Sequence, residues 1–203
     1  MTIALPAAPE FGAPVQQRPH PEVLDFLASR RSSSAVTLAE PAPSSSEIAA
    51  LISLAARVPD HGKLAPWRFI VLEGEGKAAF AARLNDLALS RGEAKAAAKL
   101  AKLKIPPAGI AVISRPKASD IHEWEQVLSA GAVCTTLLYA AQALGYGANW
   151  ITDWYAYDEE AKAILGLEPQ EKVAGFILLG TIKESPLERE RPDPAALTSA
   201  WRP

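Results

Sequence analysis

Several short segments of this 203-residue chain combine side chains that could do chemistry. The first is Arg30-Arg31-Ser32, which sets two guanidinium groups and a hydroxyl side by side after a short predicted helix. Such a set can hold a phosphate monoester through paired, charge-assisted hydrogen bonds. A structural interpretation is also available, because arginines at the C-terminus of a helix interact favourably with its dipole. Composition alone favours this structural interpretation.

Two further segments place reactive side chains next to predicted strands. The polar loop from Arg57 to Trp67 contains Arg, Asp, His and Lys residues and leads directly into an apolar stretch. Loops of this kind often line binding sites. The segment Asn149–Tyr155 combines aromatic side chains with hydroxyl groups. Ordinary roles compete equally with these functions, since His61 could be a surface or capping histidine and the aromatic residues could belong to the core.

The segment from Gly74 to Ala79 matches the G-x-G-x-x-A pattern of dinucleotide-binding turns. Glu73 and Glu75 would place carboxylates beside a pyrophosphate, which disfavours that interpretation. The residues after the next predicted helix form a basic helical pattern, whereas a dinucleotide fold needs a second strand there. The acidic residue expected about 20 positions further on would be Glu93, at a helix start. We therefore interpret the pattern as a tight strand-to-helix turn.

Composition excludes several classes of protein. The net charge is −2, from 21 basic and 23 acidic residues, which argues against nucleic acid as a partner. The single cysteine, Cys134, excludes an intrachain disulfide and a cysteine metal knuckle. The three histidines show no metal-binding spacing, so we expect no metal site. The N-terminal residues lack the pattern of a secretory signal, and we expect a reducing, cytoplasmic location.

A long uncharged stretch, from Gln126 to Thr152, raises the question of a membrane. It is long enough to span a bilayer, but it contains glutamine, serine, threonine and asparagine, and much of the rest is alanine and glycine. We predict a buried helix and no membrane partner. A helix that is apolar on all sides in so short a chain also suggests burial against another subunit.

Hydrophobic spacing and helix breakers predict a single α+β domain over residues 21–203, with a flexible arm at 1–20 and an extended tail from 184. A helix begins at Pro21. A second begins at the capping box formed by Ser44 and Glu47 and is stopped by Pro59. The remaining predicted helices are 75–90, 93–104, 120–145 and 158–165, and the predicted strands are 67–72, 109–114, 148–152 and 172–182.

In chain order, these segments resemble the nitroreductase family of FMN-dependent oxidoreductases, and above all its compact NAD(P)H nitroreductase subgroup. The resemblance implies a mixed, mostly antiparallel central sheet wrapped by helices. It also implies an intertwined homodimer built around the long helix near 120–145, with FMN at each end of the interface. The matching segments are Arg30–Ser32, Leu38–Pro43, Ala56–His61, Pro66–Phe69, Ser129–Gly131, Gly145–Gly147 with Trp150, and Gly175–Thr181.

The resemblance also assigns site residues. The residues that match Arg30, Arg31 and Ser32 hold the flavin phosphate in such enzymes, and those that match Arg57 and His61 reach the flavin from the partner chain. The residues that match Trp150, Ile151 and Thr152 lie along the flavin. A nicotinamide-nucleotide role is sometimes assigned to the segment that here comprises Ala140, Ala141, Gln142, Ala143, Leu144 and Gly145, although it resembles a buried helix with little to offer a phosphate.

One departure from the family pattern affects the flavin edge. Many relatives carry Asn and Gln ahead of the Pro-Trp pair, and this chain has Lys63 and Ala65 there. Ala65 has no side-chain donor, so backbone amides must take over that role. Lys63 could place a positive charge near the ring and favour the anionic reduced flavin. In the tail, Arg189 and Arg191 could close over the phosphate, but a solvated tail is the simpler expectation.

The function implied is hydride transfer from NADH or NADPH to flavin and then to an electron-poor small molecule, such as a nitro compound or quinone, by a ping-pong mechanism. No general acid or base is required, although water, His61 or Thr152 could supply protons. One alternative is a module that binds or stores FMN without catalysis. Another is a Rossmann-type dehydrogenase that uses the Gly74 turn.

Overall fold

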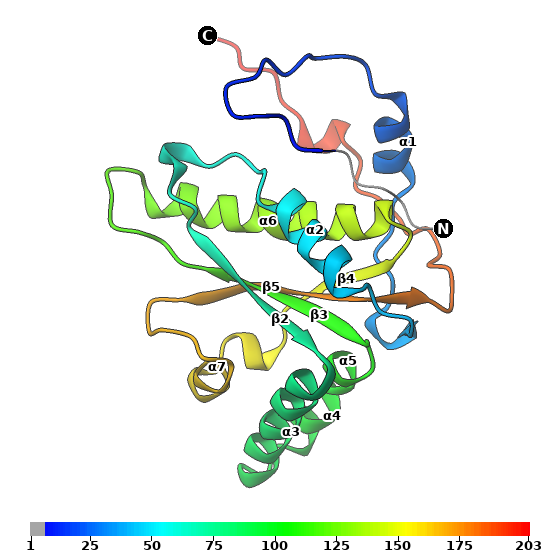
Figure 1. Cartoon of the computed structure of the whole chain (residues 1–203), viewed down its shortest axis with the longest axis vertical. Coiled ribbons are helices and arrows are strands. Elements are labelled where there is room, and N and C mark those ends of the chain that lie inside the picture. Colours follow the sequence, from blue (N-terminus) through cyan, green and yellow to red (C-terminus); the bar gives the residue numbers. More distant parts are fainter. Residues whose placement is uncertain (1–6) are drawn as a thin grey trace.

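A five-stranded sheet forms the centre of the computed structural model, which describes residues 7–203 (Figure 1). Its strands follow the order β1-β5-β3-β2, and β4 pairs with the opposite edge of β5. All pairings among the described residues are antiparallel, in keeping with the predicted mostly antiparallel sheet. The strands are β1 (Leu38–Ala39), β2 (Trp67–Glu73), β3 (Ala108–Ser114), β4 (Gly147–Ile151) and β5 (Lys172–Ile182).

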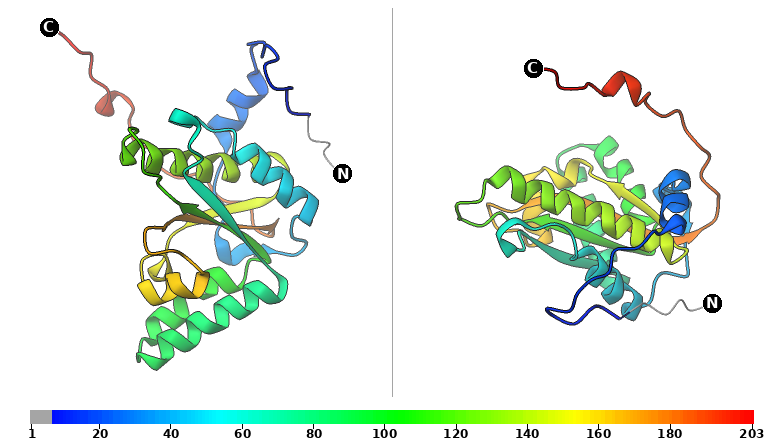
Figure 2. Two further views of the ribbon diagram at one scale, coloured as in Figure 1. Left: turned by 60° about the vertical axis from the view of Figure 1, so that its left-hand side comes forward. Right: turned by 90° about the horizontal axis from the view of Figure 1, so that it is seen from above.

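Helices cover both faces of this sheet (Figure 2). On one face lie α2 (Ser45–Ala55) and α6 (Glu123–Ala143). The other face is covered by α3 (Gly74–Ser90), α4 (Ala94–Lys99), α5 (Ala101–Lys104) and α7 (Glu159–Leu165). Successive β5 residues alternate between the two cores, since Phe176 and Leu178 join one and Ile177 and Leu179 the other. With both faces covered, β3 is buried along its whole length.

The long helix α6 is slightly shorter than the predicted range 120–145. It begins at Glu123 because the buried Gln126 side chain holds the preceding loop in a non-helical path. The Gln126 amide bonds the backbone N–H and carbonyl of Lys117 and the carbonyl of Ile121. In the described part of the chain, no helix is both long enough and apolar enough to cross a membrane.

Two predicted helix boundaries were wrong. The predicted helix 93–104 is broken at the fully buried Leu100, whose N–H bonds the carbonyl of Ala97 three residues back. Helix α2 ends at Ala55, four residues before Pro59, because the N–H of Arg57 turns to the carbonyl of Leu54. The predicted capping box at its start is confirmed, with Ser44 and Glu47 bonding each other's backbone amides. The short strand β1 was not predicted.

The topology excludes the dinucleotide-binding alternative. Strands β2 and β3 flank the Gly74 turn and the helices that follow it, and they are antiparallel neighbours, from Trp67 paired with Ser114 to Glu73 paired with Ala108. A dinucleotide-binding unit requires two parallel strands joined by a crossover helix. The Rossmann-type dehydrogenase interpretation was therefore wrong.

The described N-terminal segment from residue 7 and the C-terminal tail run outside the main body (Figure 2). The predicted arm, 1–20, lies partly outside the described residues, and from 7 to 20 the chain forms only a turn near Phe11. Helix α1 (Pro21–Ser29) has no buried residue, and its Leu24 is 68% exposed. From residue 184 onward the chain is extended except for one helical turn, Ala195–Leu197.

Candidate functional site

A pocket of about 550 Å³ lies beside the segment that follows α1. The chain leaves the helix at Arg30 in an extended conformation, so the next side chains fan out over the start of β4. The N–H of Ser33 bonds the carbonyl of Ala148 at 3.1 Å, and the Asn149 side-chain amide donates back to the Ser33 carbonyl. The pocket is lined by Arg31, Ser32, Ser33, Ser34, Thr37, Asn149 and the tail residues Glu184, Ser185, Pro186, Leu187 and Glu188.

Arg30 is held at the edge of this group by two contacts. Its guanidinium lies 5.6 Å from the centre of the Tyr139 ring, and Nη2 donates to Ser32 Oγ at 3.3 Å. The buried Nε has no hydrogen-bond partner among the described residues. A donor left unpaired inside a protein is costly, so this cluster retains hydrogen-bonding capacity for a further group.

The C-terminal tail lies against Arg31. Its Leu187 carbonyl accepts a hydrogen bond from Arg31 Nε at 2.8 Å, and the Glu188 carboxylate is 3.9 Å from the same nitrogen. Arg191 in turn bonds Glu188 at 2.9 Å. The backbone N–H of Arg189 and the nearby arginines lower the pKa of Glu188. Of the two tail arginines that were expected to be solvated, Arg191 is thus linked to the Arg31 cluster through Glu188.

Gln142 fixes the backbone of the same segment from α6. Its side-chain amide donates to the carbonyl of Arg31 at 2.5 Å, while its Oε1 has no partner among the described residues. The predicted nicotinamide-nucleotide segment, 140–145, therefore forms the C-terminal end of α6, where Ala141 is buried and Gln142 faces the arginines. The nucleotide role of this segment stays a prediction.

The loop with Arg57 and His61 lies at the other end of α6. His61 Nδ1 is 2.7 Å from the Glu125 carboxylate, and the Ser129 hydroxyl donates to the Pro59 carbonyl. These contacts attach the loop to the first turns of the helix. Arg57 is exposed, and it makes no ion pair among the described residues.

The backbone of this loop adopts an unusual conformation. Lys63 and Ala65 have positive φ angles of 55° and 45°, a region that L-residues other than glycine rarely occupy. Asp60 holds them there, because its carboxylate accepts the N–H of Leu64 at 3.1 Å and of Ala65 at 2.8 Å. The Lys63 N–H also bonds the Asp60 carbonyl. Strained residues of this kind cluster at functional sites.

This network bears on one expectation from the sequence. The loss of the family's Asn and Gln suggested that backbone amides near Ala65 would bind the flavin edge instead. The amides of Lys63, Leu64 and Ala65 are all already bonded to Asp60. Within this loop, the Lys63 side chain is therefore the remaining donor at those positions.

The residues expected along the flavin lie at the end of β4. Trp150 donates from its indole N–H to the Ala174 carbonyl at 3.2 Å and covers Gly175, where a β-carbon would collide with the indole. Ile151 packs against the core, and Thr152 accepts a hydrogen bond from the Tyr157 hydroxyl at 2.9 Å.

The two groups of predicted cofactor residues are far apart within one chain. The Arg31 segment is attached to Gln142, and His61 is attached to Glu125, 17 residues earlier on the same helix. At a rise of 1.5 Å per residue, these attachment points are about 26 Å apart. One chain therefore does not bring Arg31 and His61 to the same small molecule.

Sequence reasoning missed four polar contributors: Ser33, Asn149, Glu125 and the positioning role of Gln142. Asn149 was visible beside the aromatic segment, and Ser33 follows the Arg-Arg-Ser motif directly. The roles of Glu125 and Gln142 gave no local signal, since each acts across more than 60 residues of sequence. Among the described residues, no group of three or more His, Cys, Asp or Glu side chains is arranged to hold a metal.

Comparisons with known sequences agree on one family. The family model described as "Nitroreductase family" matches residues 27–181. The "Putative NAD(P)H nitroreductase YdjA" of Escherichia coli K12 is 33% identical over 163 residues, covering 79% of this chain and 88% of that protein. A "Putative NAD(P)H nitroreductase" of Haemophilus influenzae is 31% identical over 173 residues, covering 83% and 92% respectively.

Solved structures show the same fold. The nitroreductase-like protein of Bacillus cereus superimposes with a TM-score of 0.79 at 19% identity, covering 93% of this chain and 98% of that one. A "putative nitroreductase in complex with fmn" from Desulfovibrio desulfuricans superimposes with a TM-score of 0.71 at 20% identity, covering 93% and 100%. At these identities, the comparison establishes the architecture alone.

Proposed function

Because this chain belongs to the nitroreductase family, we propose that it is an FMN-dependent oxidoreductase that uses NADH or NADPH to reduce an electron-poor small molecule. The observation that carries the proposal is the cluster of Arg30, Arg31 and the serines beside the pocket at the start of β4. Relatives named as NAD(P)H nitroreductases and a family neighbour solved with FMN support the choice of cofactor and donor.

The residues at this cluster fit a phosphate monoester. Two guanidinium groups supply positive charge, Ser32 and Ser34 supply hydroxyl donors, and Arg30 Nε is a buried donor without a partner in the described chain. Paired donors of this kind match the geometry of phosphate oxygens. The Glu188 carboxylate 3.9 Å from Arg31 marks the same place as attractive to an anion.

The separation of the two cation groups supports a homodimer. If Arg57 and His61 contribute to the same cofactor as Arg31, they must come from a second copy whose α6 runs in the opposite direction. Twofold symmetry produces two equivalent sites, one at each end of the paired helices. The exposed apolar side chains of α1 offer additional surface for such a partner, and they include Val23, Leu24 and Leu27.

In this proposal, the residues of the chain mainly bind and orient the cofactor and the reactants. FMN, if bound here, would supply the hydride chemistry of the reaction. Trp150 and Ile151 support the ring, and Lys63 provides a cation for its polar edge. His61, held by Glu125, and Thr152, held by Tyr157, are the nearby groups that could donate a proton. A reducing, cytoplasmic location remains our expectation.

The visible spectrum of the purified protein tests this proposal. We expect a flavin spectrum that bleaches when NADH or NADPH is added without oxygen, which demonstrates the cofactor and the first half-reaction together. A flavin spectrum that stays unchanged with both donors would support a storage module instead. A colourless protein that takes up no added FMN would contradict the proposal.

His61→Ala separates binding from proton transfer. If turnover is unchanged and FMN is still bound, His61 is not the proton donor. A loss of turnover with FMN retained would support its role as a donor. The matched control is Glu125→Gln, which keeps a hydrogen bond to His61 and removes the charge beside it.

A further inference from the structure

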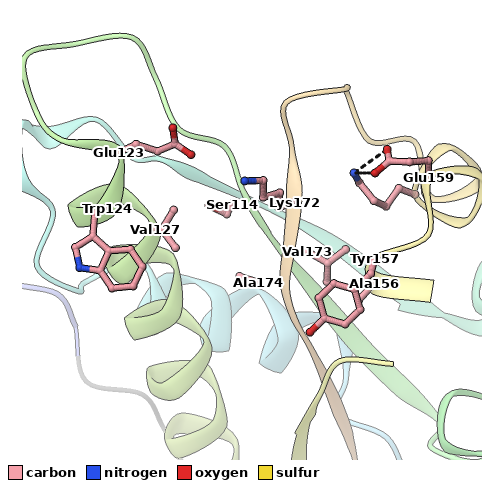
Figure 3. A pocket seen from close by; sticks show the side chains of 11 residues that line it. Ser114, Glu123, Trp124, Val127, Ala156, Tyr157, Glu159, Lys172, Val173 and Ala174 are labelled. Atoms are coloured by element: carbon pink, nitrogen blue, oxygen red, sulfur yellow. Dashed lines mark hydrogen bonds and ion pairs between the residues drawn. The ribbon is translucent and has the colours of Figure 1, made fainter. Parts of the chain in front are cut away.

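A second, larger pocket of about 580 Å³ lies between the start of α6 and the turn that precedes α7 (Figure 3). It lies beyond the end of β4, next to the part of β5 that β4 does not pair with. Strand β4 ends where Ile151 pairs with Phe176, so the outer edge of β5 from Lys172 to Gly175 has no strand partner among the described residues. None of the residues assigned above to FMN lines this pocket.

The walls of this second pocket are apolar and aromatic. Trp124 stands on α6 on one side, and Tyr157 stands on the other, as Figure 3 shows. They are 69% and 67% exposed, which is unusual for such large side chains unless a ligand or partner covers them. Val127, Val173 and Ala174 complete the surface between them. Walls of this kind fit a planar aromatic ring.

The polar groups of the pocket are not equivalent. Lys162 is paired with both oxygens of Glu159 at 2.9 Å, which cancels that charge. Lys172 makes no ion pair among the described residues, so its ammonium is available. Ser114 lies opposite Lys172 in the β3–β5 register, is 3% exposed, and its hydroxyl has no partner there. An anionic oxygen is the group that both donors would bind.

We propose that this second pocket binds an aromatic carboxylate, with the ring between Trp124 and Tyr157 and the carboxylate on Lys172 and Ser114. The pocket adjoins the strand expected along the flavin through two bonds, Trp150 to the Ala174 carbonyl and Tyr157 to Thr152. Given the proposed function, an aromatic acid held here lies beside the cofactor as an acceptor or as a competitor of one.

Glu123 allows an anionic ligand to be distinguished from a zwitterionic one. Its carboxylate is at the rim, on the same side as Lys172 in Figure 3. It opposes an anionic ligand and would attract a cationic one. An anion is therefore expected to bind more tightly after Glu123→Gln and less tightly after Lys172→Met, whereas a zwitterion would bind less tightly after both changes.

Calorimetric titration with 4-nitrobenzoate tests the site, using the FMN-loaded protein and the same protein stripped of FMN. We expect saturable binding to both forms, at least about tenfold weaker in Lys172→Met, because one charge-assisted hydrogen bond is lost. Glu123→Gln should tighten binding, and Trp124→Leu should weaken it. Lys95→Met is the matched control, since Lys95 is also an exposed lysine but lies outside the pocket. Nitrobenzene, which lacks the carboxylate, should bind at least tenfold more weakly.

Three results would overturn the proposal. Binding that Lys172→Met and Lys95→Met affect equally would show that the ammonium is not used. Weaker binding of 4-nitrobenzoate to Glu123→Gln would show that the carboxylate of this anion does not lie near Glu123. Binding that FMN abolishes would make this second pocket part of the flavin site. A protein that never binds FMN but still binds the acid through Lys172 would refute the proposed function and leave the pocket assignment standing.

Discussion

Mixing two defective variants gives a direct test of a site shared between two chains. Arg31→Glu removes a cation beside the pocket at one end of α6, and Arg57→Glu removes one from the loop at the other end. Each substitution replaces an attractive charge with a repulsive one, so each homodimer should bind FMN roughly 10- to 100-fold more weakly. The attachment points of the two segments are about 26 Å apart along the helix, so within one chain the defects are independent.

The mixture has a calculable outcome. When equal amounts exchange subunits freely, about half of the dimers contain one chain of each kind. In each of these mixed dimers, one site carries both substitutions and the other carries neither. About a quarter of all sites should therefore regain full affinity, a fraction that depends only on symmetry.

Quenching of FMN fluorescence on binding measures this fraction after co-expression of the two variants or after exchange in mild denaturant. Lys95→Glu, a charge reversal on exposed α4, controls for nonspecific effects of net charge. A mixture that binds no more FMN than its parents would refute the shared site. If the Arg57→Glu homodimer binds FMN with full affinity, the partner's loop does not contribute to the site.

Three further changes have outcomes that follow from single contacts. Gln142→Leu removes the bond to the Arg31 carbonyl, so FMN titration should show roughly tenfold weaker binding and urea unfolding a loss of about 1 kcal/mol. Arg68→Met removes two charge-assisted hydrogen bonds from the buried Glu171 carboxylate, which keeps Arg115 at 3.6 Å and the Glu168 N–H, and should cost about 2 kcal/mol at pH 7. Arg68 lowers the pKa of the Glu171 carboxyl in the folded state, from its ordinary value of 4.5. The difference in unfolding free energy between the two proteins should therefore be complete above pH 4.5 and shrink as the pH falls through the lowered pKa. A difference that stays constant from pH 7 to 2 would contradict this account. Gly76→Ala should leave FMN binding unchanged and raise the free energy of unfolding by roughly 0.5 kcal/mol, since it lies within α3 with open space around its Cα.

The last of these changes concerns the dinucleotide-binding alternative. If the Gly74–Ala79 pattern bound a nucleotide, alanine in place of Gly76 would abolish that binding. The antiparallel pairing of β2 with β3 excludes this outcome, and the open space around Gly76 leaves room for the added β-carbon. Thermal unfolding of Gly76→Ala distinguishes these outcomes in one measurement.

Elements whose cause is local were predicted well. Strand β5 was predicted with its observed bounds, because the mostly apolar segment Lys172–Ile182 lies between polar turns. The capping box at Ser44 was predicted because both of its partners lie within four residues. Boundaries that depend on burial were predicted poorly, as at Leu100, where packing of one leucine into the core interrupts a helix that its sequence would continue.

The sequence alone determined which residues we expect to carry chemistry and in what order they occur: the Arg-Arg-Ser motif, the Arg57–His61 loop and the aromatic segment at Trp150. Only the tertiary structure decided how these groups combine. Gln142 meets Arg31 across 111 positions, and Asp60 accepts the backbone N–H groups of Leu64 and Ala65. The physical reason is that hydrophobic periodicity specifies which face of each element is buried, whereas hydrogen bonds between distant polar groups depend on how the packed elements are finally oriented.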